Sequence, residues 1–321
     1  MPILSRAAVV LSVLLGTAVV TAPPAHAAFN HTVSGNVVAL VGDLVPDRDA
    51  QSLTDAQAVA SLTLDHDPDK IIHLGDLQYE CGTPANFNQN YHAVYGAVRS
   101  RIAPVIGNHE YCNGTDPAAT GYRSYFGDQA YPNGASYYSF NLNVSATRHV
   151  HFLVLNSNCL QWNTSAPGCA ENQAMQQWIR ADLAADSATC EIAVWHEPAF
   201  GSEVPSHGDG KDAMRNVWKT LDERGVDMVV TGHAHSYQRY QRMNHLGVET
   251  SSGMPSTIVG TGGRGLTDVT TYSWHGALAA LDDTHFGFLK MVFNTTATGW
   301  TQAFKTTTGT GSLDPVAYGC S

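Results

Sequence analysis

Seven polar side chains with metal-binding chemistry follow short apolar runs along this chain. Each stands where such a run ends, in a Gly-Asp, Gly-Asn, His or Gly-His element. Carboxylate, phenolate, amide and imidazole groups are hard or borderline ligands, and a hydrolase with two ions needs such a mixed set, with one carboxylate shared between the ions. The candidate ligands are Asp43, Asp76, Tyr79, Asn108, His196, His233 and His235.

Each of these elements, taken alone, also has a structural explanation. A Gly-Asp after a strand is usually a turn or a helix cap, and a histidine or tyrosine in such a place is usually a packed core residue. Gly232-His233-Ala234-His235 is a stronger element, because two histidines two residues apart at a strand end favour a metal site. The interpretation therefore depends on the whole ordered series.

The elements that must position these side chains alternate between strands and helices. Continuous apolar runs predict strands buried on both faces, at residues 37–41, 71–74, 102–106, 192–195 and 226–230. Helical spacing of apolar residues marks the segments between them, at 55–64, 88–98, 171–183 and 212–224. This alternation predicts right-handed βαβ units, and ligands bind at the carboxyl ends of strands in such sheets.

Two further segments interrupt that alternation. Residues 137–143 and 149–156 predict a hairpin, and the runs at 256–259, 286–293 and 300–305 predict meandering strands. We therefore expect an α/β fold, a four-layer α/β/β/α sandwich of two mixed β-sheets flanked by helices. Residues 28–321 are expected to form a single catalytic domain with a loose tail at 306–321.

The N-terminal residues 1–27 are predicted to be a secretory signal peptide. A short positive region at Arg6 precedes an apolar run at 7–20, and Ala25-His26-Ala27 is a small-residue cleavage site. A membrane anchor is the alternative, but the run is shorter than a bilayer requires. We expect a secreted mature protein with no membrane association. The formal net charge of −11 also argues against nucleic acid as a partner.

Six cysteines lie in the predicted mature chain, and an even number in an exported protein suggests disulfides. Fifteen pairings are possible, and sequence alone does not choose among them. The pairing we predict is Cys81–Cys112, Cys159–Cys169 and Cys190–Cys320. A cysteine metal site is the weaker alternative, because no C-x-x-C pair occurs.

The ordered elements resemble the five motifs of the calcineurin-like metallophosphoesterase superfamily. The second element has the Gly-Asp-x-x-Tyr form of the purple acid phosphatases, and Val45 stands where another large subgroup has a histidine. The first element departs from the usual Gly-Asp-x-Gly, since it reads Gly-Asp-Leu-Val. The resemblance is to the small single-domain form and covers residues 42–235, through Gly42-Asp43, Gly75-Asp76-Leu77-Gln78-Tyr79, Gly107-Asn108-His109-Glu110, Val194-Trp195-His196 and Gly232-His233-Ala234-His235.

The resemblance implies a binuclear metal centre that hydrolyses phosphate monoesters by attack of a metal-bound hydroxide. It assigns Fe(III) to Asp43, Asp76, Tyr79 and His235, and it assigns a divalent Fe, Zn or Mn ion to Asp76, Asn108, His196 and His233. Asp76 bridges the two ions. The implied substrate is a small phosphate ester.

Three neighbouring residues complete the predicted site. His109 directly follows a candidate ligand and is predicted to bind phosphate or protonate the leaving group. His207 lies in a polar loop where the family often has a substrate histidine, and Glu110 is predicted to orient His109 or a ligand. The glycine-rich segment 260–265 resembles a phosphate cradle, but we interpret it as a tight turn because no helix pattern follows.

Other functions remain open at this point. A phosphodiesterase or nucleotidase would use the same metal ligands, and a non-catalytic secreted binding protein would be expected to lack one of them. A zinc peptidase is disfavoured, because the helical H-E-x-x-H motif is absent.

Overall fold

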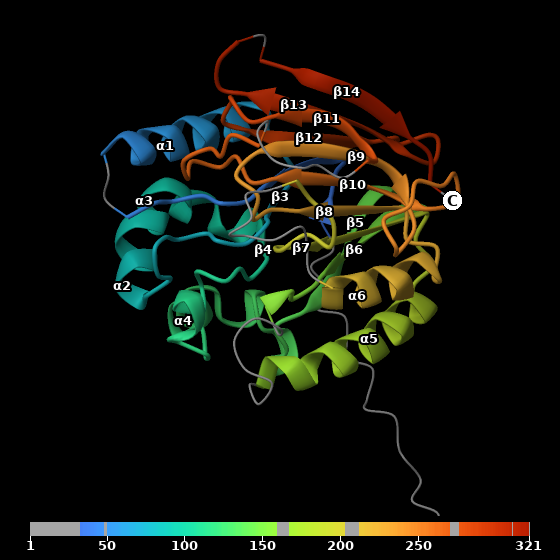
Figure 1. The fold of residues 1–321 in the computed structure, drawn as a ribbon, viewed down its shortest axis with the longest axis horizontal. Coiled ribbons are helices and arrows are strands. Elements are labelled where there is room, and N and C mark those ends of the chain that lie inside the picture. The colour runs from blue at the N-terminus through green and yellow to red at the C-terminus, as the bar shows by residue number, and fades with distance from the viewer. Residues whose placement is uncertain are drawn as a thin grey trace, which may run out of the picture.

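Two β-sheets pack face to face in this protein, and helices cover both outer faces (Figure 1). The computed structural model describes residues 33–47, 50–158, 167–202, 212–269, 276–309 and 311–320. The predicted signal peptide lies outside these residues. Among the described residues, no helix is both long and apolar enough to cross a bilayer.

The six-stranded sheet is mixed and has the strand order β14-β13-β12-β2-β3-β4. Its parallel part joins β2, β3 and β4, and β12 pairs antiparallel with β2. The strands span β2 Val37–Val41, β3 Lys70–His73, β4 Ile102–Pro104, β12 Gly287–Phe293, β13 Trp300–Thr306 and β14 Leu313–Tyr318.

The eight-stranded sheet is also mixed, with the order β1-β5-β6-β7-β8-β10-β9-β11. Strands β6, β7, β8 and β10 are parallel, and β9 is antiparallel to both β10 and β11. Strand β5 is antiparallel to β6 and parallel to β1. The strands span β1 Val33–Ser34, β5 Tyr138–Ser145, β6 Arg148–Val154, β7 Cys190–Trp195, β8 Met228–Thr231, β9 Tyr237–Met243, β10 Met254–Val259 and β11 Leu278–Asp282.

Helices form the two outer layers. Helices α5 and α6 lie along the eight-stranded sheet, and α1, α2 and α3 lie on the side of the six-stranded sheet (Figure 1). Their bounds, with the short α4, are α1 Ala50–Asp65, α2 Pro84–Asn86, α3 His92–Tyr95, α4 Thr120–Phe126, α5 Pro167–Ala185 and α6 Asp212–Asp222. A π-helical turn at Phe87–Tyr91 and a 3-10 segment at Gly96–Arg101 join α2, α3 and β4.

Three apolar clusters fill the spaces between the four layers. One lies between the sheets and includes Phe152 and Leu289, a second packs Met175 and Trp218 of the helices against the eight-stranded sheet, and a third surrounds Tyr91 on the other side. Burial on both faces explains why the central strands consist of continuous apolar runs. The predicted four-layer α/β/β/α sandwich is therefore confirmed.

The C-terminal tail differs from the sequence expectation. Residues 306–321 were expected to be loose, but β14 pairs antiparallel with β13 at the sheet edge. Arg239 Nη2 donates to Asp314 Oδ1 at 2.8 Å, and Tyr237 donates to Asp314 Oδ2 at 2.8 Å. These long-range contacts, which the tail's own composition does not reveal, hold β14 in place.

Disulfides join distant segments at two places among the described residues. Cys81 is bonded to Cys112, and Cys190 is bonded to Cys320, as the sequence interpretation predicted. The second bond ties the end of the chain to the start of β7. The third predicted pair, Cys159–Cys169, involves positions for which the structure does not describe the side chains.

Candidate metal centre

The loops that carry the candidate ligands meet at the carboxyl ends of the parallel strands of both sheets. The loop after β2 is hydrogen-bonded to the loop after β3, because Asp43 N donates to Gly75 O at 3.1 Å and Leu44 N donates to Asp76 O at 2.9 Å. The loops after β7 and β8 are joined by Gly232 N, which donates to His196 O at 3.0 Å. Sheet topology therefore gathers residues that are almost two hundred positions apart in sequence.

One group of donors consists of Asp43, Tyr79 and His235. The Tyr79 hydroxyl donates to Asp43 Oδ1 at 2.6 Å and lies 3.1 Å from His235 Nε2. His235 Nε2 is 3.4 Å from the same Asp43 oxygen. The backbone N–H of His233 donates to Asp43 Oδ2 at 2.8 Å, so the carboxylate has a fixed orientation.

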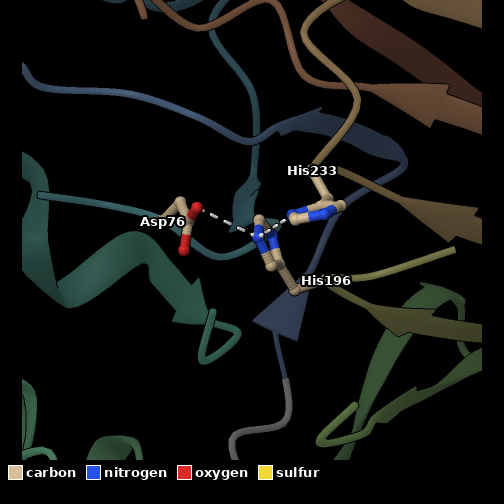
Figure 2. A group of neighbouring side chains, drawn as sticks. All are labelled: Asp76, His196 and His233. Atoms are coloured by element: carbon tan, nitrogen blue, oxygen red, sulfur yellow. Dashed lines mark hydrogen bonds and ion pairs between the residues drawn. The ribbon is translucent and has the colours of Figure 1, made fainter. Parts of the chain in front are cut away.

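The second group consists of Asp76, Asn108, His196 and His233. His196 Nε2 is the centre of this group, at 3.2 Å from each of Asp76 Oδ2, Asn108 Oδ1 and His233 Nδ1. Figure 2 shows the carboxylate and the two imidazoles pointing toward one another from three different loops. His196 and Asp76 are almost fully buried.

The hydrogen bonds behind these donors fix which atoms face the centre. His196 Nδ1 donates to the carbonyl of Leu74 at 2.8 Å, so the neutral ring presents a lone pair at Nε2. Asn108 Nδ2 donates to Asn113 Oδ1 at 2.9 Å, which leaves its carbonyl oxygen facing inward. Four potential ligand atoms thus converge, one each from Asp76, Asn108, His196 and His233, and a cation would satisfy all of them at once. The residues present therefore fit a metal ion.

His235 is held in the same way. Its Nδ1 donates to the carbonyl of Gly265 at 2.9 Å, which turns Nε2 toward Tyr79 and Asp43. A histidine ligand whose other ring nitrogen donates to a carbonyl is the usual arrangement at protein metal sites.

The charges of the site perturb the pKa values of its members. Burial would lower the pKa of His196, but the neighbouring carboxylates, Asp76 above all, raise it to about 10. Burial opposes ionisation of Asp76, but the His196 and His109 imidazoles hold its pKa well below its usual value. The site thus attracts positive charge strongly, whether as a proton or as a metal ion.

Asp76 interacts with both groups of donors. It lies beside His196 in the second group, and it also affects Tyr79 in the first. Burial raises the pKa of the Tyr79 phenol well above its usual value, and the charges of Asp43 and Asp76 raise it further. The Asp76 carboxylate therefore acts on both donor groups.

Glu110 is a buried carboxylate that joins two of the ligand loops. It accepts hydrogen bonds from the backbone N–H groups of Asp76 at 2.9 Å, Leu77 at 2.8 Å and Gly107 at 2.7 Å. Burial and the charge of Asp76 raise the pKa of Glu110 to about 8, against the effect of the N–H donors. Glu110 thus contacts the backbone of a candidate ligand rather than the His109 side chain.

His109 lies beside the centre with its Nε2 atom 3.8 Å from Asp76 Oδ2. Its Nδ1 donates to the carbonyl of Glu80 at 2.6 Å, and its ring packs against Tyr79 with centroids 4.2 Å apart. The backbone N–H of His109 also donates to Asp76 Oδ1 at 2.9 Å. The ring is therefore fixed with Nε2 on the side of Asp76.

Backbone geometry is unusual at three of the candidate ligands. Asp43, Asp76 and His233 have φ values of 62°, 50° and 70°, in the left-handed region that non-glycine residues rarely adopt. Such conformations cost on the order of 1 kcal/mol or more each and concentrate at functional sites. Gly75 permits the close approach of the next loop, because a Cβ atom there would lie 2.5 Å from His196 Nδ1.

The structure brings together all seven residues predicted as metal ligands, with His109 and Glu110 beside them. His207 lies outside the residues that the structure describes. Sequence reasoning missed Glu80, which pairs at 2.6 Å with Arg264 next to Tyr79 and His109; Arg264 was considered only as part of the segment 260–265. A charged residue directly after the Tyr79 motif was the available signal for Glu80.

The comparisons with known proteins agree with this geometry. Residues 36–237 match the family model for calcineurin-like phosphoesterases. Purple acid phosphatase 23 of Arabidopsis thaliana is 27% identical over 267 residues, which cover 70% of this chain and 52% of that protein. The chain spans smaller shares of other Arabidopsis purple acid phosphatases, down to 20% of purple acid phosphatase 18.

Solved structures show the same fold at low sequence identity. The purple acid phosphatase PPD1 from yellow lupin has a TM-score of 0.63 at 17% identity, covering 88% of this chain and 53% of that one. GAP50, described as the anchor in the inner membrane complex of Plasmodium, has a TM-score of 0.64 at 13% identity and covers 89% of both chains.

Proposed function

This chain belongs to the calcineurin-like phosphoesterase family, and from that premise we propose that it hydrolyses phosphate monoesters with two metal ions, as a purple acid phosphatase does. The observation that carries the proposal is the convergence of two donor groups, of which Asp76 belongs to the second and acts on Tyr79 of the first. A structural role for these buried polar groups would not require four potential ligand atoms to face one another.

The two groups differ in chemistry, and this difference supports two kinds of ion. The phenol of Tyr79 and the carboxylate of Asp43 are hard oxygen donors that suit Fe(III), with His235 as the third donor. The group around His196 has two imidazoles and an amide, which suit a divalent Fe, Zn or Mn ion. When bound, the ions would supply an activated water and positive charge toward the phosphate oxygens.

The protein's own groups would perform the remaining steps. His109 holds its proton at Nδ1 by donating to Glu80, so Nε2 is the atom that would contact the phosphate or pass a proton to the leaving oxygen. Glu110 would keep the loops after β3 and β4 at a fixed separation. His207 remains a proposed substrate contact.

Export of the protein is part of the same proposal. The predicted signal peptide at residues 1–27 and the bonds Cys81–Cys112 and Cys190–Cys320 support it, because disulfides persist in oxidising compartments. The test is to look for the protein outside the cells of its natural host and to sequence the N-terminus of the mature chain. A mature N-terminus at Ala28 is expected, and an uncut cytoplasmic chain would contradict it.

The activity test compares a monoester with a diester on the same metal-loaded protein. We expect hydrolysis of p-nitrophenyl phosphate to exceed that of bis(p-nitrophenyl) phosphate by at least tenfold, and we expect a chelator to abolish it. Dominant diester hydrolysis would favour the phosphodiesterase alternative. Full activity of Asp76→Ala would refute the two-ion mechanism, and the surface variant Glu223→Gln is the matched carboxylate control.

The metal assignment has a separate, spectroscopic test. A phenolate bound to Fe(III) gives a visible charge-transfer band, so the iron-loaded protein should be coloured and Tyr79→Phe should lose the band. A colourless, iron-free and fully active wild-type protein would remove the purple acid phosphatase assignment and leave the phosphoesterase one. A non-catalytic binding protein on this fold would instead bind no ions and hydrolyse neither ester.

A further inference from the structure

The glycine-rich segment 260–265, which follows β10, packs directly against the candidate metal centre. Gly262 N donates to Gly42 O at 3.0 Å, and Arg264 N donates to Asp43 O at 3.0 Å. The carbonyl of Gly265 accepts the hydrogen bond from His235 Nδ1. The backbone of Arg264 is therefore fixed beside two candidate ligands.

The Arg264 side chain reaches over the first donor group. Its guanidinium carbon lies 5.1 Å from the centroid of the Tyr79 ring, and its Nη2 lies 2.6 Å from Glu80 Oε1. The other Glu80 oxygen is 3.8 Å from His109 Nδ1. A positive charge thus stands at the rim of the site, next to the histidine proposed to contact the substrate.

The partner of Arg264 is a weak competitor for an anionic ligand. The Glu80 side chain is 53% exposed and that of Arg264 is 37% exposed, and ion pairs in such settings contribute little stability. A guanidinium has five N–H donors in a planar fork that matches a phosphate group in two contacts. Arg264 can therefore bind a phosphate while Glu80 turns to water.

The protein has a formal net charge of −11, so an anionic substrate is repelled unless a local positive charge binds it. Metal ions in the centre would neutralise the phosphate that is cleaved, but a second phosphate on the side of Tyr79 and His109 would lie near the exposed carboxylate of Glu80. Arg264 offsets that charge, because it pairs with Glu80 and lies over the Tyr79 ring.

We propose that Arg264 is a specificity-determining residue that binds a second phosphate group of the substrate, so that phosphoanhydrides such as pyrophosphate and nucleoside diphosphates are preferred over simple monoesters. This inference rests on the proposed function of the same site. In the reaction, the oxygen of one water bonds to the terminal phosphorus and the bond to the bridging oxygen breaks. The bridging oxygen leaves with the electron pair, and the two protons of the water pass to the products or to solvent.

The test uses the full-length, metal-loaded chain with pyrophosphate and p-nitrophenyl phosphate as paired substrates. Arg264→Gln is expected to lower kcat/KM for pyrophosphate about 10- to 100-fold, mainly through KM, because it removes charge-assisted hydrogen bonds. The value for p-nitrophenyl phosphate should change less than threefold. Arg101→Gln is the control, since the Arg101 side chain is 36% exposed, close to the 37% of Arg264, and also pairs with a carboxylate, that of Asp67.

A second variant separates substrate binding from a structural role of the ion pair. Glu80→Gln frees the guanidinium and should keep the preference for pyrophosphate. The inference is wrong if Glu80→Gln lowers kcat/KM for pyrophosphate as much as Arg264→Gln does. It is also wrong if Arg264→Gln lowers kcat/KM equally for pyrophosphate and p-nitrophenyl phosphate. In either case the proposed function stands. If the wild-type protein hydrolyses neither substrate, the proposed function fails and this inference fails with it.

Discussion

Replacement of Glu110 is the mutation whose effect follows most directly from the structure. The carboxylate is fully buried and accepts three backbone hydrogen bonds of 2.9 Å or shorter, from Asp76, Leu77 and Gly107. A fourth N–H, of Gln78, lies at 3.4 Å. Glu110→Ala would leave these donors buried without an acceptor in the folded protein.

The cost can be worked out from those contacts. An unsatisfied buried donor costs about 1–3 kcal/mol, and three of them would cost about 3–6 kcal/mol after relief of the repulsion between Glu110 and Asp76. Glu110→Gln keeps one carbonyl oxygen and should cost less, about 2 kcal/mol. Because domains are stable by about 5–15 kcal/mol, the alanine variant should remain foldable only with a narrow margin.

The assay is urea unfolding of the metal-free protein in chelator, followed by measurement of divalent-metal affinity. We expect the free energy of unfolding to decrease from wild type to Glu110→Gln and again to Glu110→Ala. For the glutamine variant we also expect metal affinity to fall about 10–100-fold. The control Glu223→Ala removes a carboxylate that is 48% exposed and should cost less than about 1 kcal/mol. A cost below about 1 kcal/mol for Glu110→Ala, or unchanged metal affinity, would refute the reasoning.

Three other changes test separate parts of the structure. His109→Asn should lower kcat about 10²–10⁴-fold with both metals retained, and loss of metal instead would show that His109 supports the ligands rather than the substrate. Burial raises the pKa of Glu191 from 4.5 to about 7. Between these two pH values the folded protein keeps a proton on Glu191 that the unfolded chain releases. The free energy of unfolding should therefore fall as the pH rises from 4.5 to 7. After discounting for the partial exposure of Glu191, the fall is about 1 kcal/mol, and urea unfolding of Glu191→Gln at pH 4.5 and 7 should lack that part of the slope. Changing both Cys190 and Cys320 to serine removes a disulfide that spans 130 positions, and thermal unfolding should show a loss of about 2–5 kcal/mol in the free energy of unfolding. The number of bound metal ions should stay the same, because this disulfide is not expected to support the metal centre. A double variant that binds no metal would contradict that expectation.

The central strands and the candidate ligands were predictable for the same physical reason. Strands buried between two layers are continuous apolar runs, as in Val37–Val41, and the first polar residue after such a run marks the carboxyl end. The sequence therefore located Asp43, Asp76, His196 and His233 without knowledge of the sheet order. The apolar pattern alone does not indicate which of the two donor groups each side chain joins, because that depends on the crossing of the loops; the grouping was implied only by the resemblance to the metallophosphoesterases.

Strand β9 shows why other elements were missed. It contains Tyr237 and Tyr240, each buried on an opposite face of the sheet, with glutamine and arginine between and after them. This pattern has neither the strict alternation of a half-exposed strand nor the continuous apolar run of a buried one. Its buried Gln238 is satisfied by Ser202, a contact that only the folded chain provides.

The segment 260–265 illustrates a different limit. We interpreted it from local pattern as a tight turn rather than a phosphate cradle, because no helix pattern follows it in the sequence. Nothing in the local pattern indicates that Gly265 orients His235 or that Arg264 lies over Tyr79. Those contacts arise because β10 lies next to β8 in the sheet, which places their carboxyl ends together.

The most direct test of the account is a crystal structure of the iron- and zinc-loaded protein with anomalous diffraction measured at both absorption edges. The account predicts two peaks about 3.5–4 Å apart, one beside Tyr79 and His235, the other beside Asn108 and His196, with Asp76 in contact with both. A single ion under saturating metal, or two ions that share no carboxylate, would contradict it.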